Sequence, residues 1–117
     1  MGLTRIAGEV RGPAGVVKSV NFLVDSGATY TVLPEDVWQQ IGLTARRRQR
    51  FVLADGTFME REIGQAEISL PQGETATPVI LGQPGDLPLL GAVTLEELGL
   101  VLNPFRRTLE PISAMLA

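Results

Sequence analysis

The residue best placed to do chemistry in this sequence is Asp25, which ends the apolar run 16–24 and is followed by Ser26 and Gly27. An acid between an apolar strand and a tight turn is a candidate for acid–base catalysis. We expect its carboxylate to lie in a poorly solvated place, with the Ser26 hydroxyl bonding to nearby backbone. The same residues would also suit an ordinary Asx-type turn, so the tetrapeptide alone does not decide its role.

The composition excludes most other kinds of catalyst. The 117-residue chain has no His and no Cys. It therefore cannot build, unaided, a Ser-His-Asp or Cys-His hydrolase, a disulfide or a thiolate metal site. A zinc site would have to be all-carboxylate, which is rare. Carboxylates are the leading candidates for any catalysis, and the contexts of Asp36 (start of a helix), Asp55 (a turn) and Asp86 (a Gly/Pro loop) are poorer than that of Asp25.

Charge and hydropathy limit the kinds of partner that we expect. The net charge of −3 does not favour nucleic acid or an anionic membrane. The arginine-rich stretch 46–50 is interpreted as a solvated face, because only 5% of residues are aromatic and could stack on bases. No apolar stretch approaches the length of a membrane span, and the N-terminus lacks signal-peptide order. We expect one globular domain over residues 1–117, cytoplasmic, without nucleic-acid or membrane partners.

The elements that must position Asp25 are expected to be mostly short strands. Gly and Pro are scattered as punctuation, and apolar β-branched runs lie between them. The pattern predicts strands over residues 3–10, 16–24, 30–33, 50–53, 57–63, 66–70, 77–81, 100–102 and 107–112. Asp55-Gly56 predicts a hairpin, and residues 71–74 predict a turn.

Two short helices are also predicted. The first spans 34–41, with Pro34 at its first helical position and Gly42 ending it. The second begins near Thr94, which has capping-box spacing with Glu97, and ends at Gly99.

Three features, in order along the chain, resemble the retropepsin-like aspartic peptidases, the family that includes the retroviral proteases. Residues 23–29 and 31–33 resemble the active-site loop and the strand after it. The hairpin 51–63 is similar to the flap that closes over substrate. Residues 89–91 and 95–104 resemble the hydrophobic-hydrophobic-Gly segment and the C-terminal helix that cross behind the catalytic loop. The likeness covers about four-fifths of the chain and suggests a single-domain cellular or bacterial-type member.

The resemblance implies an all-β, closed β-barrel-like acid protease fold with a flap hairpin and one or two short helices. It also implies an aspartic endopeptidase that hydrolyses a peptide or protein substrate, needs no metal or other cofactor, and works on the acid side of neutral. This route requires two carboxylates. The chain carries a single Asp-Ser-Gly loop and is half the length of a two-lobed enzyme, so the second Asp25 should come from a second copy in a homodimer.

The resemblance assigns roles residue by residue. Asp25 would activate water, and Ser26 would tie the two loops together across the dimer axis. The remaining expected site residues are Gly27, Ala28 and Thr29 beside the substrate backbone, Ala54, Asp55, Gly56 and Thr57 at the flap tip, and Leu87 and Leu89 lining apolar side-chain pockets. For each leucine alone, plain core packing is about as good an interpretation.

The sequence departs from the retroviral pattern at two places. Thr29 and Tyr30 stand where those proteases often have acids, and Ala92 and Val93 stand where they often have Arg-Asn. Both partners of an interface ion pair are missing together, so no buried charge is left unpaired. We therefore expect the dimer interface and the recognition of the substrate backbone to be arranged differently.

Two other functions remain open. The first is a catalytically silent dimerisation or peptide-binding module that keeps the fold, because fold does not guarantee function. The second is an unrelated small β-barrel that binds a ligand or oligonucleotide and is a monomer. The intact Asp25-Ser26-Gly27 weighs against the first, and the order of the three features weighs against the second.

Overall fold

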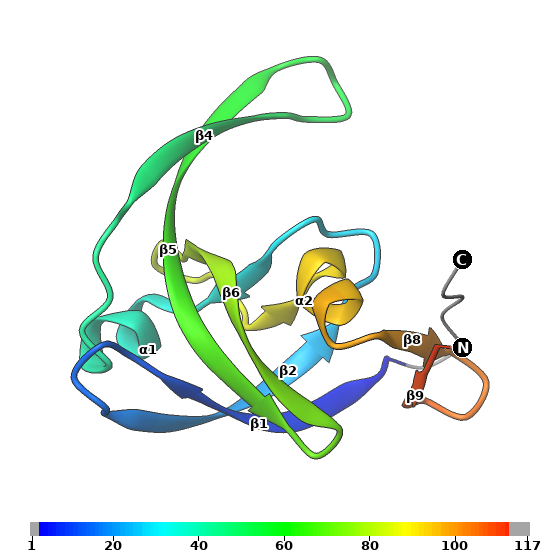
Figure 1. Ribbon diagram of the computed structural model, residues 1–117. Coiled ribbons are helices and arrows are strands. Elements are labelled where there is room, and N and C mark those ends of the chain that lie inside the picture. Colours follow the sequence, from blue (N-terminus) through cyan, green and yellow to red (C-terminus); the bar gives the residue numbers. More distant parts are fainter. Residues whose placement is uncertain (1–2, 113–117) are drawn as a thin grey trace, which may run out of the picture.

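The computed structural model describes residues 3–112, which form nine strands and two short helices (Figure 1). The all-β fold expected from the sequence, with two short helices, is confirmed. In chain order the elements are β1 (Arg5–Arg11), β2 (Val17–Val24), β3 (Thr31–Leu33), α1 (Glu35–Gln40), β4 (Arg47–Val52), β5 (Phe58–Leu70), β6 (Gly73–Leu81), β7 (Leu89–Leu90), α2 (Ala92–Glu97), β8 (Leu100–Asn103) and β9 (Thr108–Pro111).

Six of the strands close into a ring. Their pairing order is β1-β2-β7-β3-β6-β5, and residues 9–11 of β1 pair with residues 67–69 of β5. This last pairing joins the two ends of the series, so the strand pairings form a closed circuit. The short strand β7 lies between β2 and β3. The strands before and after Asp25 therefore flank the same partner, and the Asp25 loop spans it.

The core is built from alternate residues of these strands. Successive side chains of a strand point to opposite faces, so one face of each strand can be buried. In β2 the buried positions are Val20, Phe22 and Val24, and in the second half of β5 the alternating buried positions are Ala66, Ile68 and Leu70. Burial of a large apolar side chain stabilises the fold by about 1.5–3 kcal/mol. This packing fixes the strand that carries Asp25 at its end.

β4 and the first part of β5 form a hairpin that stands outside the ring (Figure 1). We call residues 47–62 the β4–β5 hairpin. The expectation of two separate strands, 57–63 and 66–70, is wrong, because β5 runs unbroken over 13 residues. Ile63 is where its pairing changes: this residue pairs with Arg47 of β4 and with Ile80 of β6. The hairpin is thus a continuation of a ring strand.

The two helices differ from expectation at their starts. α1 begins at Glu35, after Pro34, whose ψ of 154° is not helical, so the expectation that Pro34 is the first helical residue is wrong. α2 begins at Ala92, which places Thr94 inside the helix and rules out the expected capping box. The expected ends hold, since Gly42 and Gly99 both adopt left-handed conformations. Neither helix, nor any other segment within residues 3–112, is long and apolar enough to be a membrane-spanning helix.

Candidate active site

The Asp25 loop is held by backbone hydrogen bonds on both sides. The amide of Val24 donates to the Thr4 carbonyl at 2.8 Å, and that of Asp25 donates to the Leu90 carbonyl at 3.0 Å. The amide of Ala28 donates to the Asp25 carbonyl at 3.1 Å and closes the turn. Within it, Oδ1 of Asp25 accepts the amide of Gly27 at 3.0 Å. The carboxylate is therefore oriented by its own loop, on backbone anchored to β7.

Asp25, Ser26 and Gly27 are all exposed in the single chain. The expectation of a poorly solvated carboxylate is wrong for one chain, because the buried part of β2 ends at Val24 and the loop lies at the surface. The expected bond from the Ser26 hydroxyl to backbone is also absent within residues 3–112. Asp25 itself takes the Gly27 amide, as in an Asx-type turn. The arrangement leaves the acid open to solvent and to another molecule.

Three buried threonines support the loop from behind. Oγ1 of Thr94 lies 2.7 Å from Oγ1 of Thr31 and 3.2 Å from Oγ1 of Thr77. Oγ1 of Thr31 also accepts the amide of Gly91 at 3.0 Å. The bonds join β3, β6 and α2 inside the core, where an unpaired hydroxyl would be costly. We call Thr31, Thr77 and Thr94 the threonine cluster.

The segment after β7 crosses close behind the Asp25 loop. A Cβ atom on Gly91 would lie 2.6 Å from the Tyr30 carbonyl oxygen, so only glycine fits there. The amides of Ala92 and Val93 donate to the carbonyls of Ala28 and Thr29 at 2.7 and 2.9 Å. The first turn of α2 is thus bonded directly to the loop. Ala92 and Val93, which stand where the retroviral proteases often have Arg-Asn, contact the loop through their main-chain amides.

This crossing brings together the first and third of the features that resembled one family. The family model for the gag-polyprotein putative aspartyl protease matches residues 15–97. The chain belongs to this family of retropepsin-like aspartyl proteases. A search of curated proteins gave no match to the chain. The matched range runs from before β2 to the end of α2, so it includes the Asp25 loop, the β4–β5 hairpin and Gly91.

In this aspartyl protease chain an apolar cavity of about 290 Å³ lies between the hairpin and the ring. The two leucines singled out from the sequence, Leu87 and Leu89, line it together. Leu89 pairs with Leu23, two residues before Asp25, and with Val32. The other lining residues are Val32, Phe51, Leu53, Met59, Arg61, Ile80 and Asp86. The cavity is therefore close in the sheet to the strand that ends at Asp25.

The four expected tip residues, Ala54, Asp55, Gly56 and Thr57, lie exposed at the end of the β4–β5 hairpin. Oδ1 of Asp55 accepts the Thr57 hydroxyl at 2.6 Å and the Thr57 amide at 3.0 Å. These bonds lower the pKa of Asp55 below its ordinary value, the hydroxyl contributing most. Within residues 3–112 the hydrogen bonds of the tip run among residues 53–57, and none joins it to the Asp25 loop.

Tyr30, which the sequence marked only as a departure from the retroviral pattern, connects the segment after the Asp25 loop to the hairpin. Its hydroxyl donates to Oε1 of Gln49 at 3.3 Å and accepts from Nη2 of Arg47 at 3.3 Å. Its ring meets that of Phe51 edge-on, with centroids 6.1 Å apart. Tyr30 therefore joins the active-site loop region to β4. The period-two pattern of β4, which places Gln49 and Phe51 on one face, was the available signal.

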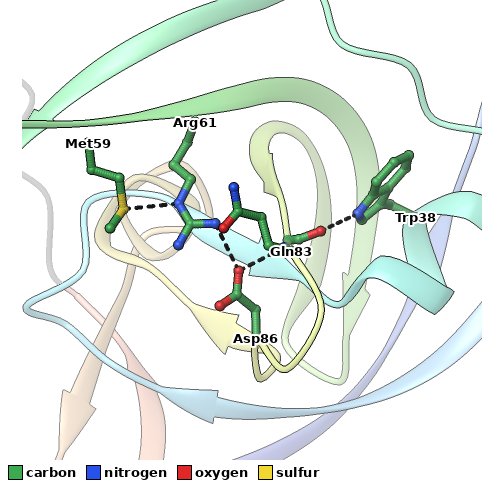
Figure 2. Close-up of polar contacts among 6 residues, drawn as sticks. Trp38, Met59, Arg61, Gln83 and Asp86 are labelled. Atoms are coloured by element: carbon green, nitrogen blue, oxygen red, sulfur yellow. Dashed lines mark hydrogen bonds and ion pairs between the residues drawn. The ribbon is translucent and has the colours of Figure 1, made fainter.

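A second contact that sequence reasoning missed joins β5 to the loop before β7. Nη1 of Arg61 lies 3.1 Å from Oδ2 of Asp86 (Figure 2). The sequence places Asp86 in a Gly/Pro loop, a poor context for a catalytic acid, and carries no local signal for Arg61. The two residues are 25 positions apart, and no local pattern links them. Both line the apolar cavity.

Proposed function

We propose that this chain is an aspartic endopeptidase that acts as a homodimer, with a water activated between two Asp25 carboxylates. The observation that carries the proposal is the exposed carboxylate of Asp25, oriented by the Gly27 amide at 3.0 Å, in a chain of the aspartyl protease family. One carboxylate cannot both take a proton from water and give one to the substrate. A pair that shares a proton does both.

The proposed reaction is direct attack by water. The ionised Asp25 takes a proton from the water held between the carboxylates, while the protonated Asp25 of the partner subunit hydrogen-bonds the scissile carbonyl oxygen. As the water oxygen adds to the carbonyl carbon, the proton of the partner carboxyl passes to the carbonyl oxygen, and a neutral gem-diol results. A proton then passes to the nitrogen, the C–N bond breaks, and a carboxylic acid and an amine leave. The step forms no acyl-enzyme and uses no cofactor.

The surrounding residues would serve this reaction. Ser26 would meet the partner loop, while Gly27, Ala28 and Thr29 would border the substrate backbone. The β4–β5 hairpin would act as a flap, with residues 54–57 at its tip. The apolar cavity lined by Leu87 and Leu89 would take an apolar side chain next to the scissile bond. The exposure of the loop and the position of the cavity beside it support these roles.

The test is the Asp25→Asn variant, assayed on peptides and unfolded proteins below neutral pH. We expect cleavage to fall to background, with sedimentation showing a dimer for both proteins, because Asn is nearly isosteric but cannot hold the shared proton. Asp36→Asn, in the first turn of α1, is the matched control and should keep full activity. Equal turnover by Asp25→Asn would instead support a silent binding module, and an active monomer would exclude the paired-carboxylate mechanism.

A further inference from the structure

Arg61 and Asp86 join two walls of the apolar cavity. Arg61 belongs to the β4–β5 hairpin, and Asp86 to the loop between β6 and β7 (Figure 2). Their side chains are 16% and 30% exposed. The other ion pairs found within residues 3–112, Arg11–Glu67 and Arg48–Glu60, have every side chain more than half exposed. Arg61–Asp86 is thus the pair least weakened by solvent.

The support on the Asp86 side is rigid. Oδ2 of Asp86 also accepts the amide of Gln83 at 2.8 Å, and the amide of Asp86 donates back to the Gln83 carbonyl at 3.0 Å. The neighbouring Gly82 carbonyl accepts the indole N–H of Trp38 at 2.8 Å, and the Gly82 amide donates to Leu33 at 2.8 Å. The turn is therefore tied to α1 and β3, as Figure 2 shows for Trp38.

The hairpin side depends on side chains. β5 pairs with the ring only from Ile63 onward, and β4 pairs only with β5. Within residues 3–112, the polar links from the hairpin to the body between Ile63 and the tip are those of Tyr30 on the β4 side and Asp86 on the β5 side. Arg61 is further held by its Nε, 3.1 Å from Sδ of Met59, which also lines the cavity. The distance of the hairpin from the ring thus depends on these contacts.

We propose that Arg61 and Asp86 are positioning residues, whose ion pair fixes the hairpin over the apolar cavity and so selects substrate side chains by size. The selection rests on the proposed peptidase function, whereas the hold on the hairpin does not. A cavity with fixed walls discriminates between side chains that differ by one methylene by about 10- to 200-fold. If the wall carrying Met59 and Phe51 can move away, the cavity adapts and that discrimination falls.

The first experiment needs no proteolysis. Amide hydrogen exchange is measured by NMR in the wild type, Arg61→Met and Asp86→Asn. Arg48→Met is the control, because Arg48 forms an exposed pair with Glu60 on the same hairpin but does not line the cavity. We expect exchange of residues 47–62 to rise at least about tenfold in the first two variants and to stay unchanged in the control. Unchanged exchange in Arg61→Met overturns the proposal.

Trp38 is the single tryptophan, so its indole N–H gives one resonance that reports on the supporting turn. Asn at position 86 can still accept the Gln83 amide, and Arg61→Met does not touch the turn. The Trp38 resonance should therefore stay in place in both variants while exchange in the hairpin rises. A displaced resonance in both would mean that the turn itself had been disrupted, which contradicts a role specific to the hairpin.

The second experiment measures kcat and KM for peptides with Ala, Val, Leu or Phe beside the scissile bond. We expect Arg61→Met to reduce the ratio between the highest and the lowest kcat/KM of these peptides at least about fivefold. KM for the preferred peptide should change more than kcat. Arg61→Lys, which keeps the charge, should recover part of the spread. If amide exchange in the hairpin rises but the range of kcat/KM over the four peptides is unchanged, the selection proposal is overturned and the proposed peptidase function is unaffected. If the wild type cleaves none of the peptides, the proposed peptidase function and the selection of substrates are both rejected. The hydrogen-exchange experiment still decides whether the ion pair holds the hairpin.

Discussion

At the scale of single residues, the site combines an exposed acid with buried hydroxyls. Asp25 is open to water in one chain, so its charge needs no partner until another molecule covers it. The hydroxyls of the threonine cluster are buried, and each has a partner within the cluster. The cluster therefore fixes β3, β6 and α2 to one another. The acid itself contributes little to holding the loop beyond its bond to Gly27.

Removing the central hydroxyl of the threonine cluster tests this support. Thr94→Val keeps the shape but leaves the hydroxyls of Thr31 and Thr77 without it as a partner. We expect the free energy of unfolding to fall by about 1–3 kcal/mol. Urea unfolding followed by circular dichroism measures it. Thr44→Val, at an exposed position, is the control, and equal losses in the two variants would refute a special role for the cluster.

The pH profile of the proposed peptidase belongs to the same scale. Turnover requires a pair of Asp25 carboxylates that holds one proton. Raising the pH removes that proton, and strong acid adds a second, so the rate should fall on both sides of a maximum. We expect the maximum of kcat/KM on the acid side of neutral, measured with a fluorogenic peptide. A maximum clearly above neutrality would contradict the shared-proton mechanism.

At the scale of elements, the sequence identified the β4–β5 hairpin but not its full length. Asp55-Gly56 marked its turn correctly, because turn chemistry is local. The break expected between residues 63 and 66 is absent, because Gly64 pairs with Val79 of β6 in an unbroken register. A Cβ at Gly64 would lie 3.1 Å from Leu81, so the glycine there allows a close approach.

Long-range packing also explains why Thr94 does not cap α2. Its spacing from Glu97 suits a capping box, but its side chain is buried and bonded to Thr31 instead. Local patterns thus predicted where turns occur. Long-range packing decided that neither the strand break at residues 64–65 nor the capping box of Thr94 forms.

The hairpin tip has a pH dependence of its own. The Thr57 hydroxyl and amide lower the pKa of Asp55, so their stabilisation of the tip is fully present above the ordinary Asp value of about 4. It is lost as the pH falls through the lowered pKa of the folded tip. Thr57→Val removes the larger contribution, and we expect the Asp55 pKa to move back up. A carboxyl-detected NMR titration measures both proteins, and an unmoved pKa would show that the hydroxyl is unimportant.

At the scale of the whole molecule, the sequence predicted the fold class because motifs in a fixed order imply a topology. It could not predict that Asp25 is exposed in the single chain, since burial depends on how the loop packs against segments distant in the sequence. It also could not supply Arg61–Asp86, a contact across 25 positions that only the folded ring brings together. The β8–β9 pair was outlined correctly by residues 100–102 and 107–112. Its place outside the ring follows from its pairing with itself alone within residues 3–112.

The β8–β9 pair is where we expect a second copy to dock. Phe105 at its turn is 87% exposed, and Val101 and Ile112 are exposed nearby in the sequence. Within residues 3–112 the pair has no further strand beside it, and an unpaired sheet edge favours association. We expect Phe105→Ser to raise the dimer Kd at least about tenfold, because it removes apolar area from the interface. Sedimentation over a concentration series measures this. Phe58→Ser, at another exposed aromatic, is the control, and a shift shared by both variants would argue against docking at this pair.

The closure of the ring through β1 and β5 has a mechanical consequence. In a sheet with two edge strands, pairing can be lost from either edge. In a closed circuit, separating one pair of strands strains the pairs beside it. The β4–β5 hairpin leaves this circuit at Ile63, and its residues 47–62 pair with no strand of the ring other than β5. The hairpin is held to the body by side chains such as Arg61 and Tyr30, so its position can change without breaking any strand pairing of the ring.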